Sequence, residues 1–151
     1  MTTFVELFSA HHRYCDGLFA DAENAAEARD WGACLATAES FGAALEAHFA
    51  AEEDGLFPAF EGKTGMTQGP TRVMRMEHAQ IRQLQDQLIE AARASKADAF
   101  QSVAETLLIM MEQHNMKEEN ILYPMCDQHV GGDAELRARL VEMLQTPEGT
   151  A

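Results

Sequence analysis

The chain has 151 residues, the length of one domain with room for a single substantial core. Hydrophobic residues make up 46% and charged residues 24%, a balance typical of a folded globular protein and not of a disordered chain. The formal net charge of −14 argues against nucleic acid and against anionic membranes as partners, because phosphate groups bind to basic surfaces.

Targeting and redox features indicate a cytoplasmic protein. The first residues, MTTFVELFSAHHRYCD, lack the basic segment and apolar run of a signal peptide, and no stretch of about twenty apolar residues could span a membrane. The three cysteines, Cys15, Cys34 and Cys126, are widely spaced and form no CxxC pair. We therefore expect buried free thiols, not disulfides or a thiolate zinc site. We also expect the protein to be a monomer or a homodimer.

Helix-forming residues are abundant and runs of β-branched residues are missing, which predicts an all-α fold. Breaks fall near Asp30, at EGKTGMTQGP (61–70) and at ASKAD (94–98). The predicted helices are 3–28, 30–60, 69–94 and 98–128, followed by a short amphipathic helix over 133–144 that stops before Pro147. Long helices joined by short connections predict an antiparallel up-down four-helix bundle over residues 1–130, with a short helix and tail over 131–151.

Polar residues at these breaks are suited to cap the helices. Thr2 or Thr3, Asp30 and Asp98 can each accept a hydrogen bond from a backbone N–H at a helix start. Pro70 suits the first turn of the third helix, where the missing N–H has no helical partner to lose. These residues predict where the four long helices begin.

The two halves of the chain repeat each other. HFAAEEDGLFP, from His48 to Pro58, matches HNMKEENILYP, from His114 to Pro124, without a gap and at a numbering offset of 66 (114 − 48). The same offset pairs His12 with His78. The sequence therefore predicts one helical hairpin present twice, with a pseudo-twofold axis through the bundle.

Polar residues interrupt the apolar stripe of each predicted long helix. On the last helix, His114 and Glu118 lie within a stripe formed by Leu107, Met110, Met111, Ile121 and Met125. Their i, i+4 spacing places both side chains on one face of the helix. The same pattern on the other helices gives four imidazoles and two carboxylates directed at one axis: His12, His48, Glu52, His78, His114 and Glu118.

A single histidine on an apolar face is usually a hydrogen-bonded core residue, and a single HxxxE is usually an ordinary helical pair. Two HxxxE pairs repeated at one offset, with two further inward histidines, are different. Burying two carboxylates beside four imidazoles is costly without a counter-charge, and two metal ions would supply it. Imidazole and carboxylate without thiolate suit iron, and suit manganese, zinc or copper less well.

Glu52 and Glu118, one from each half, are natural bridges between two ions, each held by two of the histidines. With an added oxo or hydroxo bridge, about one position on each ion stays open for a small molecule. The Glu-x-x-His pairs of the ferritin-like di-iron class are missing, which excludes the ferritin and oxygenase pattern.

The spacing His12 … His48-x-x-x-Glu52 … His78 … His114-x-x-x-Glu118 resembles that of the hemerythrin-like family, also called the HHE cation-binding domain, over about residues 3–130. The resemblance implies a four-helix bundle around a non-haem di-iron centre, with the histidines as ligands and the glutamates as bridges. Members of the family bind oxygen reversibly, sense oxygen or iron, or act on nitric oxide and in iron–sulfur repair.

The chain departs from the oxygen-carrying members at two positions. Those members place a further histidine one turn before the third-helix ligand and use an aspartate on the last helix, whereas this chain has Met74 and Glu118. The chain therefore resembles a four-histidine, two-glutamate variant. This variant disfavours long-lived oxygen carriage and favours nitric oxide, peroxide or iron handling.

We therefore expect a di-iron protein that binds oxygen or nitric oxide, for sensing, stress response or iron handling. The alternatives are a di-iron enzyme, either a peroxidase or a nitric oxide reductase, and an iron store or donor.

The sequence does not decide the roles of several neighbouring residues. His11 is a weaker candidate ligand than His12, because the repeat favours His12. The others are Glu53 and Glu119 as outer partners or replacement ligands, Tyr14 and Tyr123 as donors, Cys15 as a residue that tunes the site, and His129 as a cap or a solvent-facing residue.

Overall fold

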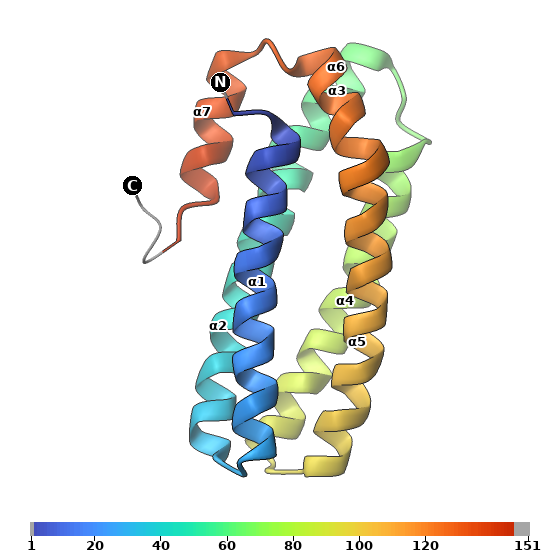
Figure 1. Ribbon diagram of the computed structural model, residues 1–151. Helices are drawn as coiled ribbons and strands as arrows, with labels where there is room; N and C mark the ends of the chain where they lie inside the picture. Colours follow the sequence, from blue (N-terminus) through green and yellow to red (C-terminus); the bar gives the residue numbers. More distant parts are fainter. Residues whose placement is uncertain (1, 147–151) are drawn as a thin grey trace.

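The computed structural model describes residues 2–146, which form long helices packed side by side (Figure 1). In chain order the helical segments are α1 (Phe4–Glu27), α2 (Trp31–Ala51), η1 (Glu52–Leu56), α3 (Phe57–Thr64), α4 (Pro70–Arg93), α5 (Ala97–Lys117), η2 (Glu118–Leu122), α6 (Tyr123–Val130) and α7 (Ala134–Met143). Residues 2–146 contain no strand, so the predicted all-α four-helix bundle with a short C-terminal helix is confirmed. The predicted stop at Pro147 lies outside the described residues.

Two of the predicted caps open the first hairpin. Thr3 accepts a hydrogen bond from the backbone N–H of Glu6, and the Glu6 carboxylate accepts one from the backbone N–H of Thr3, which makes a capping box at the start of α1. Asp30 accepts a hydrogen bond from the backbone N–H of Ala33 at the start of α2. Both predicted starts are therefore confirmed, with Thr3 and not Thr2 as the cap.

The second hairpin begins differently. Pro70 is the first residue of α4, as predicted. The predicted cap at Asp98 is wrong, because α5 begins at Ala97 and its N-cap position is Lys96, which makes no side-chain capping bond. Asp98 instead lies in the first turn, where its negative charge is stabilised by the positive end of the helix dipole.

The two hairpin turns confirm the internal repeat at the level of the backbone. Arg29 and Ser95, related by the same offset of 66 (95 − 29), both adopt left-handed backbone angles, with φ of 59° and 55°. Their N–H groups donate to the carbonyls of Ala26 and Ala92, which the offset also relates. The first helix of each hairpin, α1 or α4, therefore ends in the same turn. In this turn a left-handed residue allows backbone N–H groups to donate to the last carbonyls of the helix.

A π-helical turn follows the histidine in both α2 and α5. In η1 the N–H of Phe57 donates to the carbonyl of Glu52, and in η2 the N–H of Tyr123 donates to the carbonyl of Glu118, five residues back in each case. The prediction of unbroken α-helices over 30–60 and 98–128 is wrong at these turns. A π turn holds one extra residue and is common at functional sites.

The extra residue changes which side chains face the core. Ile121, predicted on the buried stripe, is 56% exposed, whereas Leu122 and Tyr123 are buried. Pro58 and Pro124 follow the two turns at matching positions. Because proline offers no N–H and its ring crowds the carbonyl four residues before it, a wider turn just before it relieves that contact.

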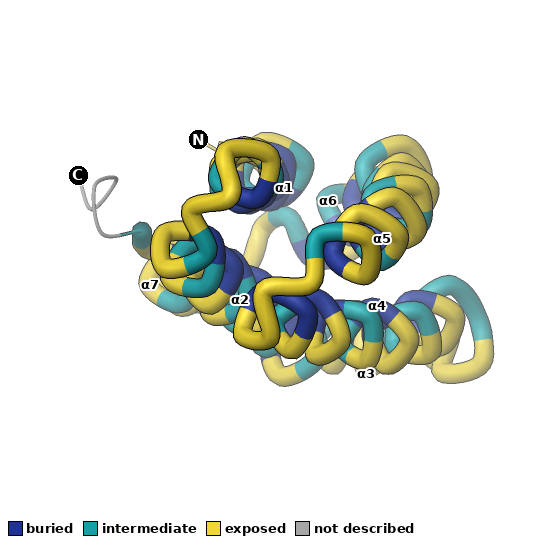
Figure 2. Tube along the Cα trace, turned by 90° about the horizontal axis from the view of Figure 1, so that it is seen from below, coloured by how far each residue is buried: buried dark blue, intermediate teal, exposed yellow. Residues whose placement is uncertain are grey.

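The buried residues form two apolar clusters, one at each end of the bundle. One surrounds Phe41 and Leu88 near the hairpin turns, and the other surrounds Phe8 and Leu56 beside α7. Figure 2 shows the buried positions turned toward the space between the helices. A layer of buried polar side chains separates the clusters. Within residues 2–146, no helix combines the length and the apolar character needed to cross a membrane.

Helix α7 covers η1 from outside the bundle. Leu136 and Leu140 of α7 are buried in the cluster that contains Phe8 and Leu56. Gly55 permits this contact, because a Cβ at that position would lie 2.7 Å from Leu140 Cδ2. The corresponding position in η2 is Ile121, which is exposed instead.

Candidate metal centre

Six buried side chains meet in the polar layer between the two apolar clusters. They come from the inner faces of all four long helices and from the first residue of each π turn: His12, His48, His78, His114, Glu52 and Glu118. None of them is more than 5% exposed. The structure therefore brings together all six residues that the repeated spacing singled out.

The four histidines form two pairs. The ring centroids of His12 and His48 lie 4.5 Å apart, and those of His78 and His114 lie 5.0 Å apart. Each pair takes one histidine from each helix of a single hairpin: His12 and His48 share the first hairpin, and His78 and His114 share the second. The pseudo-twofold axis relates one pair to the other.

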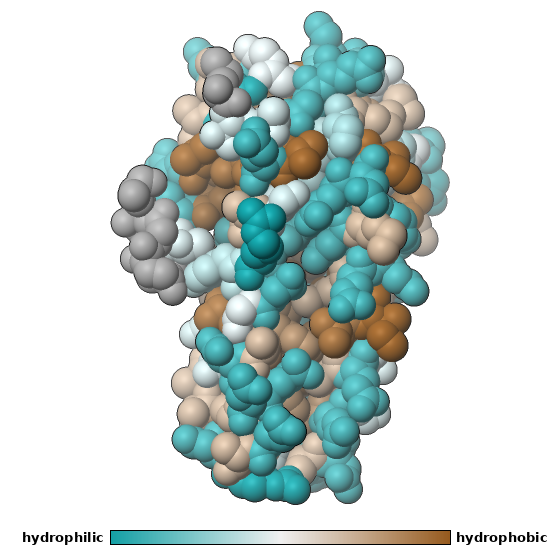
Figure 3. Space-filling model, in the orientation of Figure 1, coloured by the Kyte–Doolittle hydropathy of each residue, from teal (hydrophilic) through white to brown (hydrophobic). Residues whose placement is uncertain are grey.

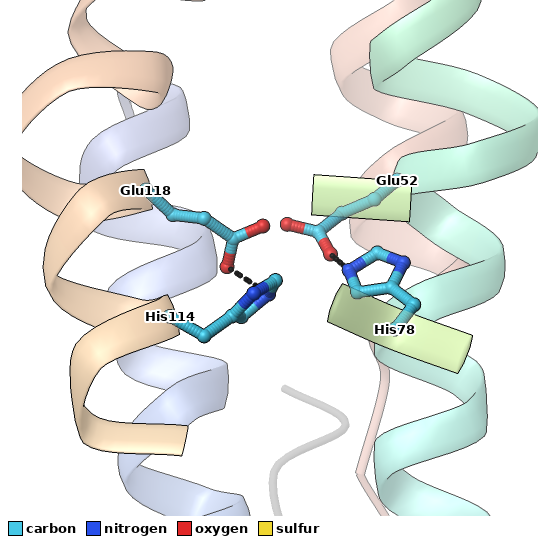
Figure 4. A group of neighbouring side chains, drawn as sticks. All are labelled: Glu52, His78, His114 and Glu118. Atoms are coloured by element: carbon cyan, nitrogen blue, oxygen red, sulfur yellow. Dashed lines mark ion pairs between the residues drawn. The ribbon is translucent and has the colours of Figure 1, made fainter. Parts of the chain in front are cut away.

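Each glutamate stands between the two pairs. Glu52 Oε1 lies 3.1 Å from His78 Nε2, and its Oε2 lies 3.6 Å from His48 Nε2. Its counterpart Glu118 stands between the other two histidines, with Oε1 at 3.2 Å and 3.3 Å from their Nε2 atoms. Figure 4 shows the two carboxylates facing each other above the imidazoles of the second pair.

These positions allow two overlapping sets of ligand atoms. The first set, with all atoms within 4.8 Å of one another, comes from Glu52, His78, His114 and Glu118; the second comes from His12, His48 and Glu118. Glu118 belongs to both sets. Each set could hold a metal ion, and the two sets share one carboxylate, a feature of dinuclear sites.

Unsatisfied polar atoms mark the centre of the first set. Glu52 Oε1, His78 Nε2, His114 Nε2 and Glu118 Oε2 are fully buried and make no hydrogen bond. Glu52 Oε1 and His78 Nε2 lie within ion-pair distance of each other, but without the alignment of a hydrogen bond. Buried polar atoms without partners cost free energy, and a cation among these four would satisfy all of them. The donor set therefore fits a metal.

Outer carboxylates fix the orientation of three histidines through Nδ1. The pairs are His12 with Glu119 (2.6 Å), His78 with Glu53 (2.6 Å) and His114 with Glu77 (2.8 Å). Because Nδ1 is engaged outward, Nε2 faces the centre, which is the usual arrangement behind histidine ligands. Glu53 and Glu119, left open by the sequence, thus lie behind the ligand positions, and Glu77 was missed.

Nearby carboxylates raise the pKa of three imidazoles. Burial opposes the charged form of His114, but Glu118 outweighs this effect and raises its pKa. Burial disfavours the charged form of His12, but hydrogen bonds to Glu118 and Glu119 outweigh it and raise its pKa to about 9. Burial also disfavours the charged form of His78, but Glu52 and Glu53 outweigh it and raise its pKa to about 9. At neutral pH both His12 and His78 hold a proton that balances the carboxylates.

At Nδ1 of His48 the partner is another imidazole, whereas the other three histidines have a carboxylate partner there. His11 Nδ1 lies 2.9 Å from His48 Nδ1, and the rings stack with centroids 5.0 Å apart. Burial, with the charge of His48 nearby, lowers the pKa of His11 to about 3. His11 therefore supports His48 from behind and does not take the place of His12. Its counterpart in the repeat is Glu77.

Tyr123 enters the centre from the start of α6. Its hydroxyl lies 2.6 Å from Glu52 Oε2 and 2.9 Å from Glu118 Oε1, and 3.2 Å from Nε2 of both His12 and His48. Burial and the two carboxylates raise its pKa well above the usual value. The counterpart of Tyr123 is Phe57, which has no hydroxyl and stacks on His78 instead.

An arginine and a phenylalanine support His78 from the outside. Phe49 stacks on His78 with centroids 3.8 Å apart, and the guanidinium of Arg82 lies over Phe49 at 5.0 Å. Arg82 also donates to Glu53 and Glu46. Burial opposes the charge of Glu53, but its bonds from His78 and Arg82 outweigh this and lower its pKa to about 2.

Other residues that the sequence left open lie away from the centre or take no direct part. Cys15, Cys34 and Cys126 are buried and free, as predicted. Cys15 Sγ lies 3.7 Å from His11 Nδ1, and burial raises its thiol pKa to about 12. His129 is exposed and packs against Phe60, which confirms that it lies outside the centre.

Comparison with known proteins identifies the family. The model of the Hemerythrin HHE cation binding domain matches residues 3–126, a span that contains all four histidines and both glutamates of the centre. Neither the curated proteins nor the solved structures include a match to the chain. The family match and the buried histidine and glutamate cluster indicate a metal-binding protein. The chain belongs to the hemerythrin HHE cation-binding family.

Proposed function

We propose that the protein holds two iron ions and binds a small diatomic molecule, oxygen or nitric oxide, beside them. The observation that carries this proposal is the group of four buried, unpartnered atoms on Glu52, His78, His114 and Glu118. Two overlapping ligand sets support two ions over one. Imidazole nitrogen and carboxylate oxygen without thiolate favour iron.

Each of the two histidine pairs would hold one of the two ions. His78 and His114 would hold one ion and His12 and His48 the other, with Glu52 and Glu118 shared between them. Bound iron would supply exchangeable ligand positions and two oxidation states. The chain itself keeps each Nε2 directed inward through an Nδ1 partner, and the two apolar clusters exclude water from above and below.

Tyr123 supports an alternative function as a peroxide-reducing enzyme. Its hydroxyl is a phenolic donor directed at both carboxylates, so it could pass a proton to a substrate oxygen beside them. Mixing the reduced iron protein with oxygen, nitric oxide or hydrogen peroxide separates the two functions. A stable, reversible adduct supports binding or sensing, and repeated turnover with an added reductant supports the enzyme.

Metal analysis of protein from iron-replete cells tests the proposal. We expect two irons per chain, one for each ligand set, and loss of iron with lower stability in His114→Ala, because metal binding and folding are linked. His129→Ala is the matched control, since His129 lies further along the same run of helix, in α6, but is exposed. Wild-type protein with no iron, or equal loss in both variants, would overturn the proposal.

A further inference from the structure

The repeat places two equivalent clefts on the bundle, one between α2 and α4 and the other between α1 and α5. The α2–α4 cleft has a volume of about 430 Å³ and the α1–α5 cleft about 610 Å³. Matching residues line them: Glu46 and Leu45 in the first correspond, through the repeat, to Glu112 and Met111 in the second. The clefts differ in what lies at their inner ends.

Phe49 and Arg82 close the α2–α4 cleft before it reaches the centre. Both line this cleft, Phe49 covers the face of His78, and Arg82 is held across Phe49 by Glu46 and Glu53. Phe49 is only 1% exposed and His78 is completely buried. A molecule in this cleft therefore meets a phenyl ring and an ion pair, not an imidazole.

The α1–α5 cleft has smaller residues at the same two positions. The counterpart of Phe49 is Asn115, and the counterpart of Arg82 is Asp16. With neither ring nor guanidinium in place, the lining of this cleft includes His12 and its partner Glu119. The two halves thus differ at the positions that decide whether the histidines can be reached.

A small inner cavity continues from the α1–α5 cleft. The two spaces share His12, Asp16, Met111 and Asn115 in their walls, and the inner cavity adds His48 and His114. Its remaining walls are mostly apolar, and its volume is about 10 Å³. A space of this size holds about one water molecule, so it selects ligands of one or two non-hydrogen atoms.

We propose that the α1–α5 cleft is the access route to the metal centre, and that small neutral ligands of one or two non-hydrogen atoms bind in the inner cavity beside His12, His48 and His114. The proposal rests on the proposed function, because it names the ligand class and the path for that same site. The equivalent α2–α4 cleft is closed by Phe49 and Arg82.

The charge of the cleft favours neutral ligands. Asp16, Glu112 and Glu119 line it, with Arg13 as the cation beside them. Figure 3 views the face formed by α1 and α5, where hydrophilic side chains predominate. Anions are repelled by an excess of carboxylates, whereas dioxygen, nitric oxide and hydrogen peroxide carry no charge.

The closed cleft supplies the design of the test variant. Asp16→Arg with Asn115→Phe gives the α1–α5 cleft the residues of its counterpart. The new phenyl group can stack on His12 as Phe49 does on His78, and the new guanidinium meets Glu112 and Glu119, the counterparts of Glu46 and Glu53. Asn115→Phe alone is the second variant. Ala43→Phe is the control, because it adds the same ring to the α2–α4 cleft.

Stopped-flow mixing of the reduced iron protein with nitric oxide gives the first readout, with iron content measured on each sample. We expect unchanged iron in all variants, and binding roughly tenfold slower or more in both the double variant and Asn115→Phe, equal to about 1.4 kcal/mol of added barrier. Ala43→Phe should bind at the wild-type rate. Equal rates in wild type and both α1–α5 variants, or equal slowing by Ala43→Phe, would overturn the access route.

A second readout needs no iron. Dissolved oxygen is paramagnetic and shortens the NMR relaxation times of methyl groups that it reaches, so metal-free protein under oxygen pressure reports on access to the inner cavity. We expect strong effects on the methyl groups of Met111 and Ile81, and their loss in the double variant. The same effects in both proteins would overturn the proposal. Failure of the proposed function would show separately, as wild-type protein without iron.

Discussion

The hydroxyl of Tyr123 donates a hydrogen bond of 2.6 Å to Glu52 Oε2, across the pseudo-twofold axis. The equivalent residue in the first half is Phe57, which has no hydroxyl. Only the second half therefore directs a hydroxyl at the carboxylates from this position. The hydroxyl also lies 3.2 Å from both His12 Nε2 and His48 Nε2, which places it on the side of the first histidine pair. The two ligand sets are therefore chemically different although the backbone is repeated.

Replacing Tyr123 with phenylalanine should destabilise the protein. Tyr123→Phe leaves the fully buried Glu52 Oε2 without its hydroxyl donor, and such a loss costs about 1–3 kcal/mol. Urea unfolding of the metal-free protein measures the difference. Tyr14→Phe is the matched control, because it removes the same hydroxyl from a side chain that is only partly buried. Equal effects of the two substitutions would contradict the role given to Tyr123.

Glu53 should raise the affinity of the centre for iron without touching the metal. It accepts a hydrogen bond from His78 Nδ1 and thereby fixes the ring and increases the basicity of Nε2. Glu53→Gln is expected to weaken iron binding by roughly 10- to 100-fold, the range usual for partners behind histidine ligands. Competition with a chelator of known affinity measures the change.

Glu46→Gln is the control for that experiment. Glu46 also pairs with Arg82 but has no hydrogen bond to a histidine of the centre. It should leave the iron affinity almost unchanged, because its ion pair is exposed and contributes little. If Glu46→Gln weakened iron binding as much as Glu53→Gln does, the effect would come from Arg82 and not from the bond to His78.

The six residues of the centre could be predicted because their pattern is local and repeated. An i, i+4 pair such as His48 and Glu52 shares a helix face whatever the tertiary structure is. The offset of 66 then singled out His12 over His11 and matched the two halves. The helix starts followed from caps and proline for the same local reason, and among them only Asp98 was misplaced. The end predicted at residue 60 was also wrong, because α3 continues to Thr64.

The positions of Ile121, Tyr123, His11 and Glu77 could not be predicted from the periodicity of an α-helix. A π turn adds one residue to the helical repeat, so it moved Ile121 to the surface and brought Tyr123 into the centre. The contact between His11 and His48 joins side chains from two helices, and its counterpart in the second hairpin joins Glu77 to His114. Applying the offset to His11 would have identified Glu77 as a candidate.

Glycine should stabilise the two hairpin turns. Arg29 and Ser95 adopt left-handed backbone angles, in which a side chain is strained and glycine is not. The left-handed conformation costs a residue with a side chain about 1–2 kcal/mol, and the greater freedom of glycine in the unfolded chain offsets about 0.5–1 kcal/mol of that gain. Arg29→Gly and Ser95→Gly are therefore each expected to increase the free energy of unfolding by about 0.5–1 kcal/mol. Ala28→Gly is the control, because Ala28 has an ordinary φ of −78° and should lose stability. A loss of stability at all three positions would contradict the prediction.

Two protonated imidazoles should make the metal-free protein sensitive to alkali. Although burial opposes their charge, the carboxylates beside His12 and His78 raise the pKa values of both in the folded chain to about 9, from an ordinary 6.5. Because the folded state holds these protons more tightly, their contribution to stability is complete below about pH 6.5 and is lost as the pH rises through about 9. Thermal unfolding of metal-free protein across this range should show a falling Tm.

Iron binding should therefore release protons at neutral pH. A metal ion needs the Nε2 lone pair, so it must displace the proton that each of His12 and His78 holds below about pH 9. Proton release should be greatest near neutrality and should decline as the pH approaches 9, and the affinity for ferrous iron should rise over the same interval. Titrating metal-free protein with ferrous iron in weakly buffered, oxygen-free solution with a pH indicator measures the release.

His129→Ala is the control for this titration. It should release the same number of protons as wild type, because His129 lies outside the centre. Iron uptake without proton release would mean that these imidazoles are already neutral, and the charge balance between them and the carboxylates beside them would be wrong.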